Sequence, residues 1–219
     1  MGKKGKEPTP PPEPAEPEGG RKWSDDIEAL IAEVMNRFGD VERRDGRMAD
    51  EPALIAGPSN VHDVASFLKT NEILPLNFCR AVTGIDKVDR FEVVYNLAHL
   101  SMPDTAGEFE RVALVVAISD REDPSTPTLM DLWPGVDFQE REVFDLVGIK
   151  FDNHPDLRRI LLDEEFIGHP LRKDYPLMGR WEDMQAIEAY LDENQVRAMK
   201  EEAGLDFDPE KDVPPSYKR

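Results

Sequence analysis

The feature that most constrains this chain is the stretch 137–177, in which a short helical pattern is followed by two proline-locked tracts. Its first residue, an aspartate, and Glu140 are spaced as a capping box, and Gly148 can supply the left-handed residue that ends a helix. The tracts HPDLRR from His154 and HPLRKD from His169 each place proline after histidine, which favours extended backbone at the histidine. Because charged residues alternate with rigid extended backbone, the stretch is better suited to binding a partner's surface than to enclosing a small substrate.

Two blocks within this stretch carry a resemblance to a known family. The first block comprises Glu140, Arg141, Glu142, Asp145, Leu146, His154, Arg158, Ile160 and Leu161. The second block is the run GHPLRKDYPL, which starts at Gly168. Their order and spacing resemble the signature of the thirty-kilodalton subunit, also called the C subunit, of respiratory complex I, the proton-pumping NADH:quinone oxidoreductase. The strand-rich region from about Leu54 fits the same family pattern.

Three positions depart from the family pattern. Phe138 stands where tryptophan is usual, and Val147 stands where phenylalanine is usual. Asn153 replaces the usual glycine before the first His-Pro pair. Since asparagine is one of the few other residues that tolerate positive φ, we expect the turn at this position to survive the replacement.

Composition excludes several classes of function. The net charge of -19 argues against general affinity for nucleic acid or for an anionic membrane surface. Cys79 is the only cysteine, so an intrachain disulfide is impossible and an ordinary iron–sulfur cluster lacks ligands. No apolar run approaches the roughly 20 residues that span a bilayer.

The chain divides into four predicted parts. Residues 1–22 form a disordered leader rich in Pro, Glu and Lys, and residues 23–135 form an α+β domain. Residues 136–177 hold the signature helix and an extended docking segment, and residues 178–219 hold a helix and a polar tail. The predicted fold class is therefore α+β, a mostly antiparallel sheet with packed helices, followed by the docking segment and a helix.

The expected elements follow from apolar periodicity. The predicted helices are 25–38, with Asp25 and Glu28 as a capping box, then 60–70 and 181–202, with a helical turn at 129–133. The predicted strands are two short ones within 41–56 around the turn pair Asp45-Gly46, then 77–85, 91–100 and 111–119. The last of these is apolar on both faces, which predicts a central strand.

The charged residues of the signature helix admit a catalytic and a structural interpretation. Arg141 and Asp145 are predicted to form an i,i+4 ion pair, and the cap accounts for Glu140, which leaves no paired carboxylates for acid–base chemistry. We therefore expect no catalytic residue. The predicted interface residues are Glu140, Arg141, Glu142, Asp145, His154, Arg158, Arg159, His169, Arg172, Lys173, Asp174 and Tyr175.

The histidines and basic pairs admit a further interpretation as ligand sites. His154 and His169 lie near Asp156 and Asp174, but the spacing of zinc ligands is absent, so no metal site is expected. The basic pairs that begin at Arg158 and Arg172 are flanked by acids, which favours protein ion pairs over phosphate contacts. No glycine-rich nucleotide loop occurs, so no cofactor is expected in this chain.

The resemblance implies a role in an electron-transfer complex. It implies an accessory subunit without a cofactor, peripheral on the cytoplasmic face of the bacterial membrane, whose partner subunits hold FMN and iron–sulfur clusters. Its implied neighbours are the larger, quinone-pocket subunit and the subunit with the terminal cluster, with the membrane arm only indirectly. Two alternatives stay open: the homologous subunit of an energy-converting hydrogenase or F420 dehydrogenase complex, and a free-standing binding module for an acidic ligand.

The tract 169–177 is predicted to dock on a partner. Pro170 and Pro176 keep the tract out of helices, and its mixed polar and apolar side chains are typical of a covered interface. On this hypothesis Arg172→Glu disrupts assembly and leaves the isolated domain unaffected.

Overall fold

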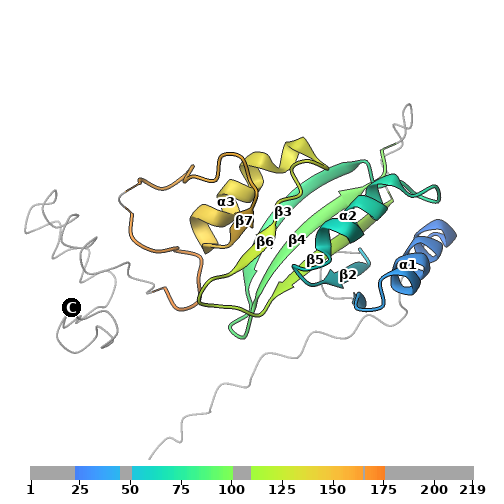
Figure 1. The fold of residues 1–219 in the computed structure, drawn as a ribbon, viewed down its shortest axis with the longest axis horizontal. Coiled ribbons are helices and arrows are strands. Elements are labelled where there is room, and N and C mark those ends of the chain that lie inside the picture. Colours follow the sequence, from blue (N-terminus) through green and yellow to red (C-terminus); the bar gives the residue numbers. More distant parts are fainter. Residues whose placement is uncertain (1–22, 45–50, 101–109, 165, 176–219) are drawn as a thin grey trace, which may run out of the picture.

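The computed structural model describes residues 23–44, 51–100, 110–164 and 166–175, and these form a sheet with helices packed on one of its faces (Figure 1). The sheet has five strands in the order β1-β2-β5-β4-β3. Their bounds are β1 (Glu42–Arg44), β2 (Ala53–Ala56), β3 (Phe78–Asp86), β4 (Phe91–Ala98) and β5 (Arg111–Ile118). β2 and β5 run parallel, whereas β1–β2, β4–β5 and β3–β4 are antiparallel. The predicted α+β class, the mostly antiparallel sheet and the central place of β5 are confirmed.

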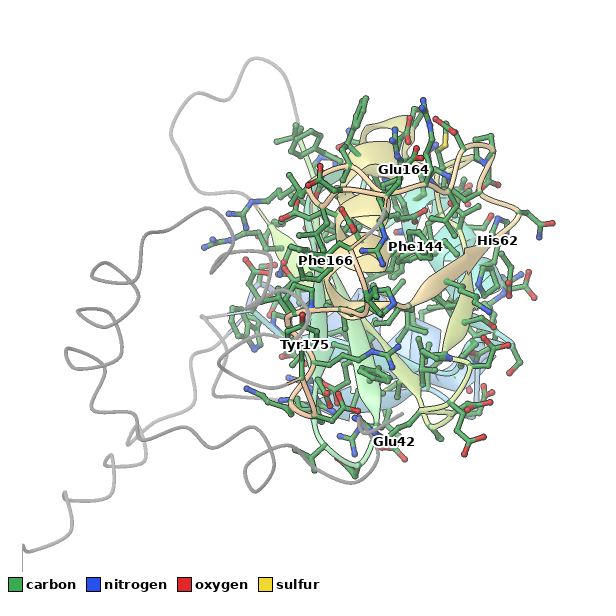
Figure 2. All side chains as sticks on the ribbon, turned by 90° about the vertical axis from the view of Figure 1, so that its left-hand side faces the viewer. Glu42, His62, Phe144, Glu164, Phe166 and Tyr175 are labelled. Atoms are coloured by element: carbon green, nitrogen blue, oxygen red, sulfur yellow. The ribbon has the colours of Figure 1, made fainter. Side chains whose placement is uncertain are left out.

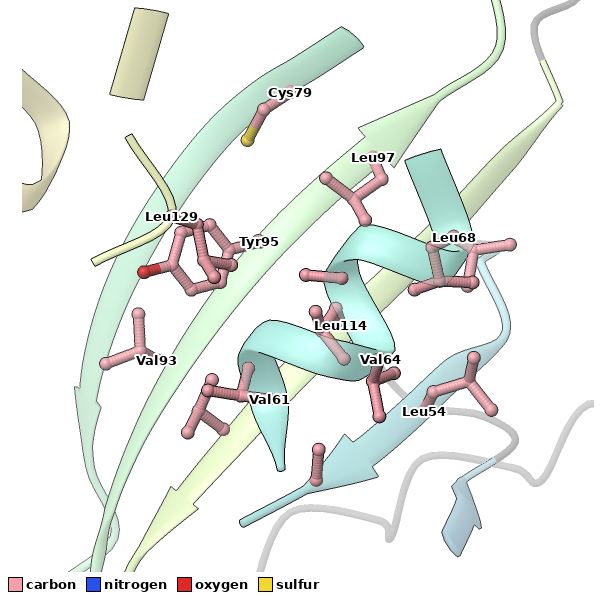
Figure 3. Close-up of a cluster of buried hydrophobic side chains, with 14 of the residues drawn as sticks. Leu54, Val61, Val64, Leu68, Cys79, Val93, Tyr95, Leu97, Leu114 and Leu129 are labelled. Atoms are coloured by element: carbon pink, nitrogen blue, oxygen red, sulfur yellow. The ribbon is translucent and has the colours of Figure 1, made fainter. Parts of the chain in front are cut away.

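The alternating side chains of β4 define the inner, helix-covered face of the sheet. Phe91, Val93, Tyr95 and Leu97 point to one side and are fully buried. The helix α2 (Val61–Thr70) lies across this face, and its apolar side chains meet those of β2 and β5, as Figure 3 shows. The same inner face receives α1 (Asp25–Arg37) and α3 (Asp137–Val147). The core is therefore a single apolar layer between the sheet and three helices.

The start of α1 differs from the predicted capping box. Ser24 is the N-cap, and its hydroxyl accepts the N–H of Ile27 at 3.3 Å. Glu28 instead forms a bidentate pair with Arg43 of β1, at 2.6 and 3.0 Å. The serine lies one residue ahead of the predicted cap and is itself a preferred N-cap, so it takes that role. Glu28 therefore does not cap the helix, and its ion pair with Arg43 links α1 to the edge strand β1.

The predicted capping box at the start of α3 is also wrong. A 3-10 turn, η1 (Pro134–Val136), leads directly into α3, and Val136 at the N-cap already has helical φ and ψ. Because the chain is already helical there, no extended residue presents a side chain to the first N–H groups. The predicted end of the helix is confirmed: Gly148 has φ +80. Asn153 has φ +64, as expected at a position where the family pattern has glycine.

Close packing of α3 on the edge strand β3 depends on one glycine. A Cβ on Gly84 would lie 2.7 Å from Cγ1 of Val143, closer than real Cβ contacts allow. The missing side chain lets the helix approach the strand. Gln139 of α3 accepts the N–H of Val82 at 2.6 Å through its Oε1, so the helix also satisfies a main-chain donor of the edge strand.

A second, two-stranded sheet flanks α3. Its parallel strands are β6 (Ser125–Pro127) and β7 (Lys150–Asp152), and the predicted turn near Leu129 follows β6. The predicted leader 1–22, the turn pair Asp45-Gly46 and the predicted helix 181–202 lie outside the described residues.

Candidate functional site

The family-like residues gather on α3 and on the two segments that pass over it, 153–164 and 166–175, which together we call the α3 unit. Figure 2 views the molecule from this side and shows these segments crossing in front of α3. Phe166 and Tyr175 lie near one another in that view, and their rings stack with centroids 6.2 Å apart. The segments are thus packed on the helix rather than extended away from it.

Asp145 is the hub of the α3 unit. Its fully buried carboxylate accepts three consecutive main-chain N–H groups at 2.7–3.0 Å and a guanidinium N–H of Arg159 at 2.9 Å. The three N–H groups belong to Ile160, Leu161 and Leu162. Burial opposes ionisation, but these donors together hold the pKa of Asp145 below its ordinary value. A carboxylate of the helix therefore fixes the path of the following segment.

Two arginines complete this anchoring. Arg141 is buried, and it donates to the carbonyl oxygens of Arg158 and Arg159 at 3.2 and 3.4 Å and lies 3.6 Å from Asp156. Arg159 in turn donates to the carbonyl oxygen of Gly168 at 3.1 Å, which ties the first segment to the second. The predicted i,i+4 pair of Arg141 with Asp145 is therefore wrong. Tertiary partners engage each side chain more fully than an exposed helix pair would.

The second segment caps the C-terminal end of α3. Nδ1 of His169 lies 2.9 Å from the carbonyl oxygen of Asp145, and the N–H of Leu171 donates to that of Leu146 at 3.0 Å. Arg172 donates to the carbonyl oxygens of Val147 and Gly148 at 2.6 and 3.2 Å. These carbonyls have no partner within the helix, and the cation also complements the negative end of the helix dipole. Burial lowers the pKa of His169.

The path of the second segment is fixed again where it reaches the sheet. The N–H of Lys173 donates to Asp86 at the end of β3 at 2.9 Å, and Arg121 pairs with the same carboxylate at 2.6 and 3.2 Å. The bonds from Arg121 lower the pKa of Asp86 well below its usual range. The guanidinium groups of Arg121 and Arg172 both lie against the ring of Phe91, 4.4 and 5.0 Å from its centroid.

Glu140 belongs to a separate buried polar cluster beneath α3. It accepts the hydroxyl groups of Tyr95 at 2.9 Å and Thr128 at 2.5 Å, and the N–H of Leu129 at 3.0 Å. The buried imidazole of His154 brings Nε2 within 4.0 Å of Glu140 and 3.5 Å of Asp137. Burial raises the pKa of Glu140 despite these hydrogen bonds, and burial also raises the pKa of Tyr95 well above its ordinary value.

The remaining predicted residues lie at the rim of the α3 unit. Glu142, Lys173 and Asp174 have exposed side chains. Arg158 is 70% exposed and pairs with Asp156 at 2.8 and 3.0 Å. Within the described residues, no group of three or more His, Cys, Asp or Glu side chains could hold a metal ion. No helix in the described part of the chain is long and apolar enough to cross a bilayer.

Comparison with known proteins decides the family. Residues 54–180 match the family described as respiratory-chain NADH dehydrogenase, 30 Kd subunit, and the match spans more than half of the chain. The chain belongs to this family. The matched range starts within β2, at Leu54, and contains β3, β4, β5 and the whole α3 unit, so the family resemblance of the signature stretch is confirmed.

Relatives within this family agree along most of their length. The C subunit of NADH-quinone oxidoreductase from Moorella thermoacetica is 41% identical over 153 residues, which is 69% of this chain and 96% of the relative. The corresponding protein of Geobacter sulfurreducens is 43% identical over 133 residues, covering 59% of this chain and 76% of that protein.

Two solved structures share the fold of this family member. The trypsin-resistant fragment of Nqo5 superposes with a TM-score of 0.50 at 30% identity, covering 60% of this chain and 99% of the fragment. A polypeptide of the membrane-bound sulfane sulfur reductase, an archaeal respiratory membrane complex, superposes with a TM-score of 0.59, covering 86% of this chain and all of that one. At 19% identity, this second likeness shows the fold alone.

The structure of this family member gives its signature a role that spacing did not predict. Asp145, Arg141, Arg159, His169 and Arg172 hold the unit together through main-chain groups. What the unit displays is a set of apolar side chains that the predicted interface residues did not include. They are Phe138 at 62% exposure, Leu161 at 60%, Leu171 at 57%, Ile167 at 47% and Ile160 at 37%. We call these five the apolar patch.

Proposed function

We infer that this chain is a non-catalytic structural subunit of a bacterial NADH-quinone oxidoreductase, which binds its neighbours through the apolar patch. The oxidoreductase passes electrons from NADH through FMN and iron–sulfur clusters to quinone and couples this to proton translocation. The chain braces that path without holding a cofactor. Its proposed place is peripheral, on the cytoplasmic face of the membrane.

The observation that carries this proposal is the contrast between the buried and the displayed residues of the α3 unit. Apart from Glu140, its buried or half-buried charged groups bond main-chain atoms of the same unit, so they hold its segments together. The segments they fasten hold Leu161, Ile167 and Leu171 outward on fixed backbone. Rigid, exposed apolar side chains with a polar rim are typical of a surface that a partner covers.

The proposed partners are the larger, quinone-pocket subunit and the neighbouring subunit with the terminal cluster. Contact with the membrane arm is indirect, and no nucleic acid takes part. Relatives 41–46% identical to this chain bear the name of the C subunit of NADH-quinone oxidoreductase. Their names favour this complex over a hydrogenase or F420 dehydrogenase and over a free-standing module.

The experiment replaces Leu161 by aspartate in a tagged chain that is then purified with its complex. The side chain is exposed in the isolated chain, so the melting temperature should hardly change. In a covered interface the buried charge is expected to weaken association by about 2 kcal/mol or more, roughly 30-fold. Recovery of partner subunits, measured by mass spectrometry, should fall accordingly.

Ile73→Asp is the matched control, because Ile73 is 37% exposed, like Ile160 of the patch, and lies in the loop after α2, beside residues of α1. Normal assembly of the Leu161→Asp chain, with normal quinone reductase activity, would contradict the docking role of the patch. The absence of a cofactor is tested separately. Stoichiometric iron or flavin, or a visible absorption band, in the pure chain would overturn that part of the proposal.

A further inference from the structure

Two polar atoms beneath the start of α3 are buried and have no hydrogen-bond partner among the described residues. They are Nε2 of His154, whose side chain is fully buried, and Oδ1 of Asp137. His154 follows β7 and begins the first His-Pro pair, whereas Asp137 is the first residue of α3. The two atoms lie 3.5 Å apart, which is longer than a normal hydrogen bond from nitrogen to oxygen. Since buried polar groups almost always have a partner, this pair indicates a binding site for one.

The carboxylate of Asp137 is directed at the imidazole rather than at its own helix. An acidic side chain at the start of a helix commonly accepts the first N–H groups, but α3 has no side-chain cap bond. The side chain of Asp137 is 29% exposed, and its Oδ1 is nevertheless buried. The carboxylate therefore extends from the surface of the molecule to His154.

The hydrogen bonds of the imidazole identify which ring nitrogen carries the hydrogen. Nδ1 accepts the main-chain N–H of Asp156 at 3.2 Å, so its lone pair is in use and it has no hydrogen of its own. The ring hydrogen is therefore on Nε2, and His154 presents an N–H donor to the neighbouring carboxyl groups. With this hydrogen in place, Nε2 has no lone pair to offer to a metal ion.

The surrounding groups specify the chemistry of the missing partner. It must accept a hydrogen bond from Nε2 of His154 and donate one to Oδ1 of Asp137. Glu140 adds a further acceptor, because its Oε2 lies 4.0 Å from Nε2 and can take another bond beside the one from Thr128. A metal cation cannot accept from an N–H group, and an anion would face two carboxyl groups. The partner is therefore a neutral group that both donates and accepts.

A single water molecule meets these requirements. A hydrogen bond to water spans about 2.8 Å, so one molecule can bond Nε2 and Oδ1 together across their separation of 3.5 Å. Buried water molecules typically make about three hydrogen bonds to polar groups that otherwise have no partner. We propose that His154, Asp137 and Glu140 bind one buried water molecule that is a permanent part of this fold.

The bound water joins the first His-Pro turn to the start of α3. It lies at Nε2 of the imidazole, while Nδ1 of the same ring holds the N–H of Asp156, so both ring nitrogens fix the turn. Glu140 continues the connection to the hydroxyl group of Tyr95 on β4, at 2.9 Å. Hydrogen bonds therefore run from Asp137 at the surface to Tyr95 in the core. This role belongs to the isolated chain and does not depend on the proposed function.

The test counts long-lived internal water molecules in the isolated full-length chain, by magnetic relaxation dispersion of the water oxygen nucleus. His154→Phe keeps a ring and removes both nitrogens, so the count should fall by one relative to the native chain. His154→Gln keeps an N–H donor near the position of Nε2, so the count should stay the same. His62→Phe is the matched control, because His62 is 43% exposed and pairs with Asp131 at the surface. Its count should equal that of the native chain.

A second variant keeps the test decisive if His154→Phe does not fold, which circular dichroism establishes. Asp137→Ala changes a partly exposed side chain and should also lower the count by one. In the native chain, nitrogen NMR should find the ring hydrogen of His154 on Nε2. An unchanged count in Asp137→Ala or in folded His154→Phe would overturn the proposal. A ring hydrogen on Nδ1, or an equal loss of water in His62→Phe, would do so too.

Discussion

Arg172 donates its Nε–H to the carbonyl oxygen of Val147, the last residue of α3, 2.6 Å away. The same guanidinium also bonds the carbonyl oxygen of Gly148, where a Cβ would collide with Arg172 and His169. The sequence predicted a docking role for Arg172 that leaves the isolated chain unaffected. The structure changes that expectation, because the side chain already stabilises the end of a helix within its own chain.

Arg172→Glu should therefore destabilise the isolated chain. It removes two charge-assisted hydrogen bonds and places a negative group at the negative end of the helix dipole, which together cost about 2 kcal/mol or more in the free energy of unfolding. Urea denaturation followed by circular dichroism measures this. Arg158→Glu, at a 70% exposed position, is the control and should leave the unfolding midpoint almost unchanged. If the two variants unfold at the same urea concentration, Arg172 does not stabilise the isolated chain and its role is purely intermolecular.

Asp145→Asn should be strongly destabilising at neutral pH. In the variant, Arg159 and some of the three main-chain N–H groups that bond Asp145 lose their charged acceptor. This should lower the free energy of unfolding by about 3 kcal/mol. Because the pKa of Asp145 is lowered on folding, its contribution is present above the unfolded value of about 4 and is lost as pH falls through the folded value. The stability difference between native chain and variant should therefore shrink below about pH 4. A difference that stays constant down to low pH would mean that the carboxylate charge is not what stabilises the segment.

Glu140→Gln should be much milder than Asp145→Asn, although both carboxyls are fully buried. Burial raises the pKa of Glu140, so the folded chain holds this proton more tightly than the unfolded chain does. Its contribution to stability therefore declines as pH rises from about 4.3 through the folded value, and a neutral amide avoids this penalty. We expect a change within about 1 kcal/mol at pH 7, measured by thermal unfolding.

Glu140→Ala is the matched comparison for this variant. It removes the acceptor for the hydroxyl groups of Tyr95 and Thr128 and opens a cavity, so it should cost several times more than the amide. If the amide proves as damaging as alanine, the ionised form of Glu140 is required by the fold.

Gly84→Ala should destabilise the chain by about 1–3 kcal/mol, because the added methyl meets Val143 across the β3–α3 contact. Gly135→Ala adds the same group where nothing lies within 4 Å, and it should have little effect. Combining Gly84→Ala with Val143→Ala should recover part of the lost melting temperature. An unchanged melting temperature for Gly84→Ala alone would show that α3 can shift away from the strand without loss.

Local sequence patterns determined the elements of this protein. Side chains two residues apart on a strand point to the same face, and this repeat identified Phe91, Val93, Tyr95 and Leu97 as one buried face. Apolar residues on both faces identified β5 as the central strand. Gly148 ended its helix, and Asn153 took positive φ where the family pattern has glycine. These features could be predicted because each depends on the conformational preferences of a few neighbouring residues. The family signature was evident in the same way, since it is a pattern of spacing.

Only the tertiary structure decided which partner each charged side chain takes. Arg141 and Asp145 are spaced as a helix pair, yet Arg141 binds main-chain oxygens of the next segment and Asp145 binds its N–H groups. Glu140 is spaced to cap its helix, yet it lies 2.9 Å from Tyr95 of β4. A buried charge takes the partners that compensate best for lost water, and these come from segments far apart in the chain. Sequence spacing records local neighbours, whereas burial and the path of the chain selected the partners in the fold.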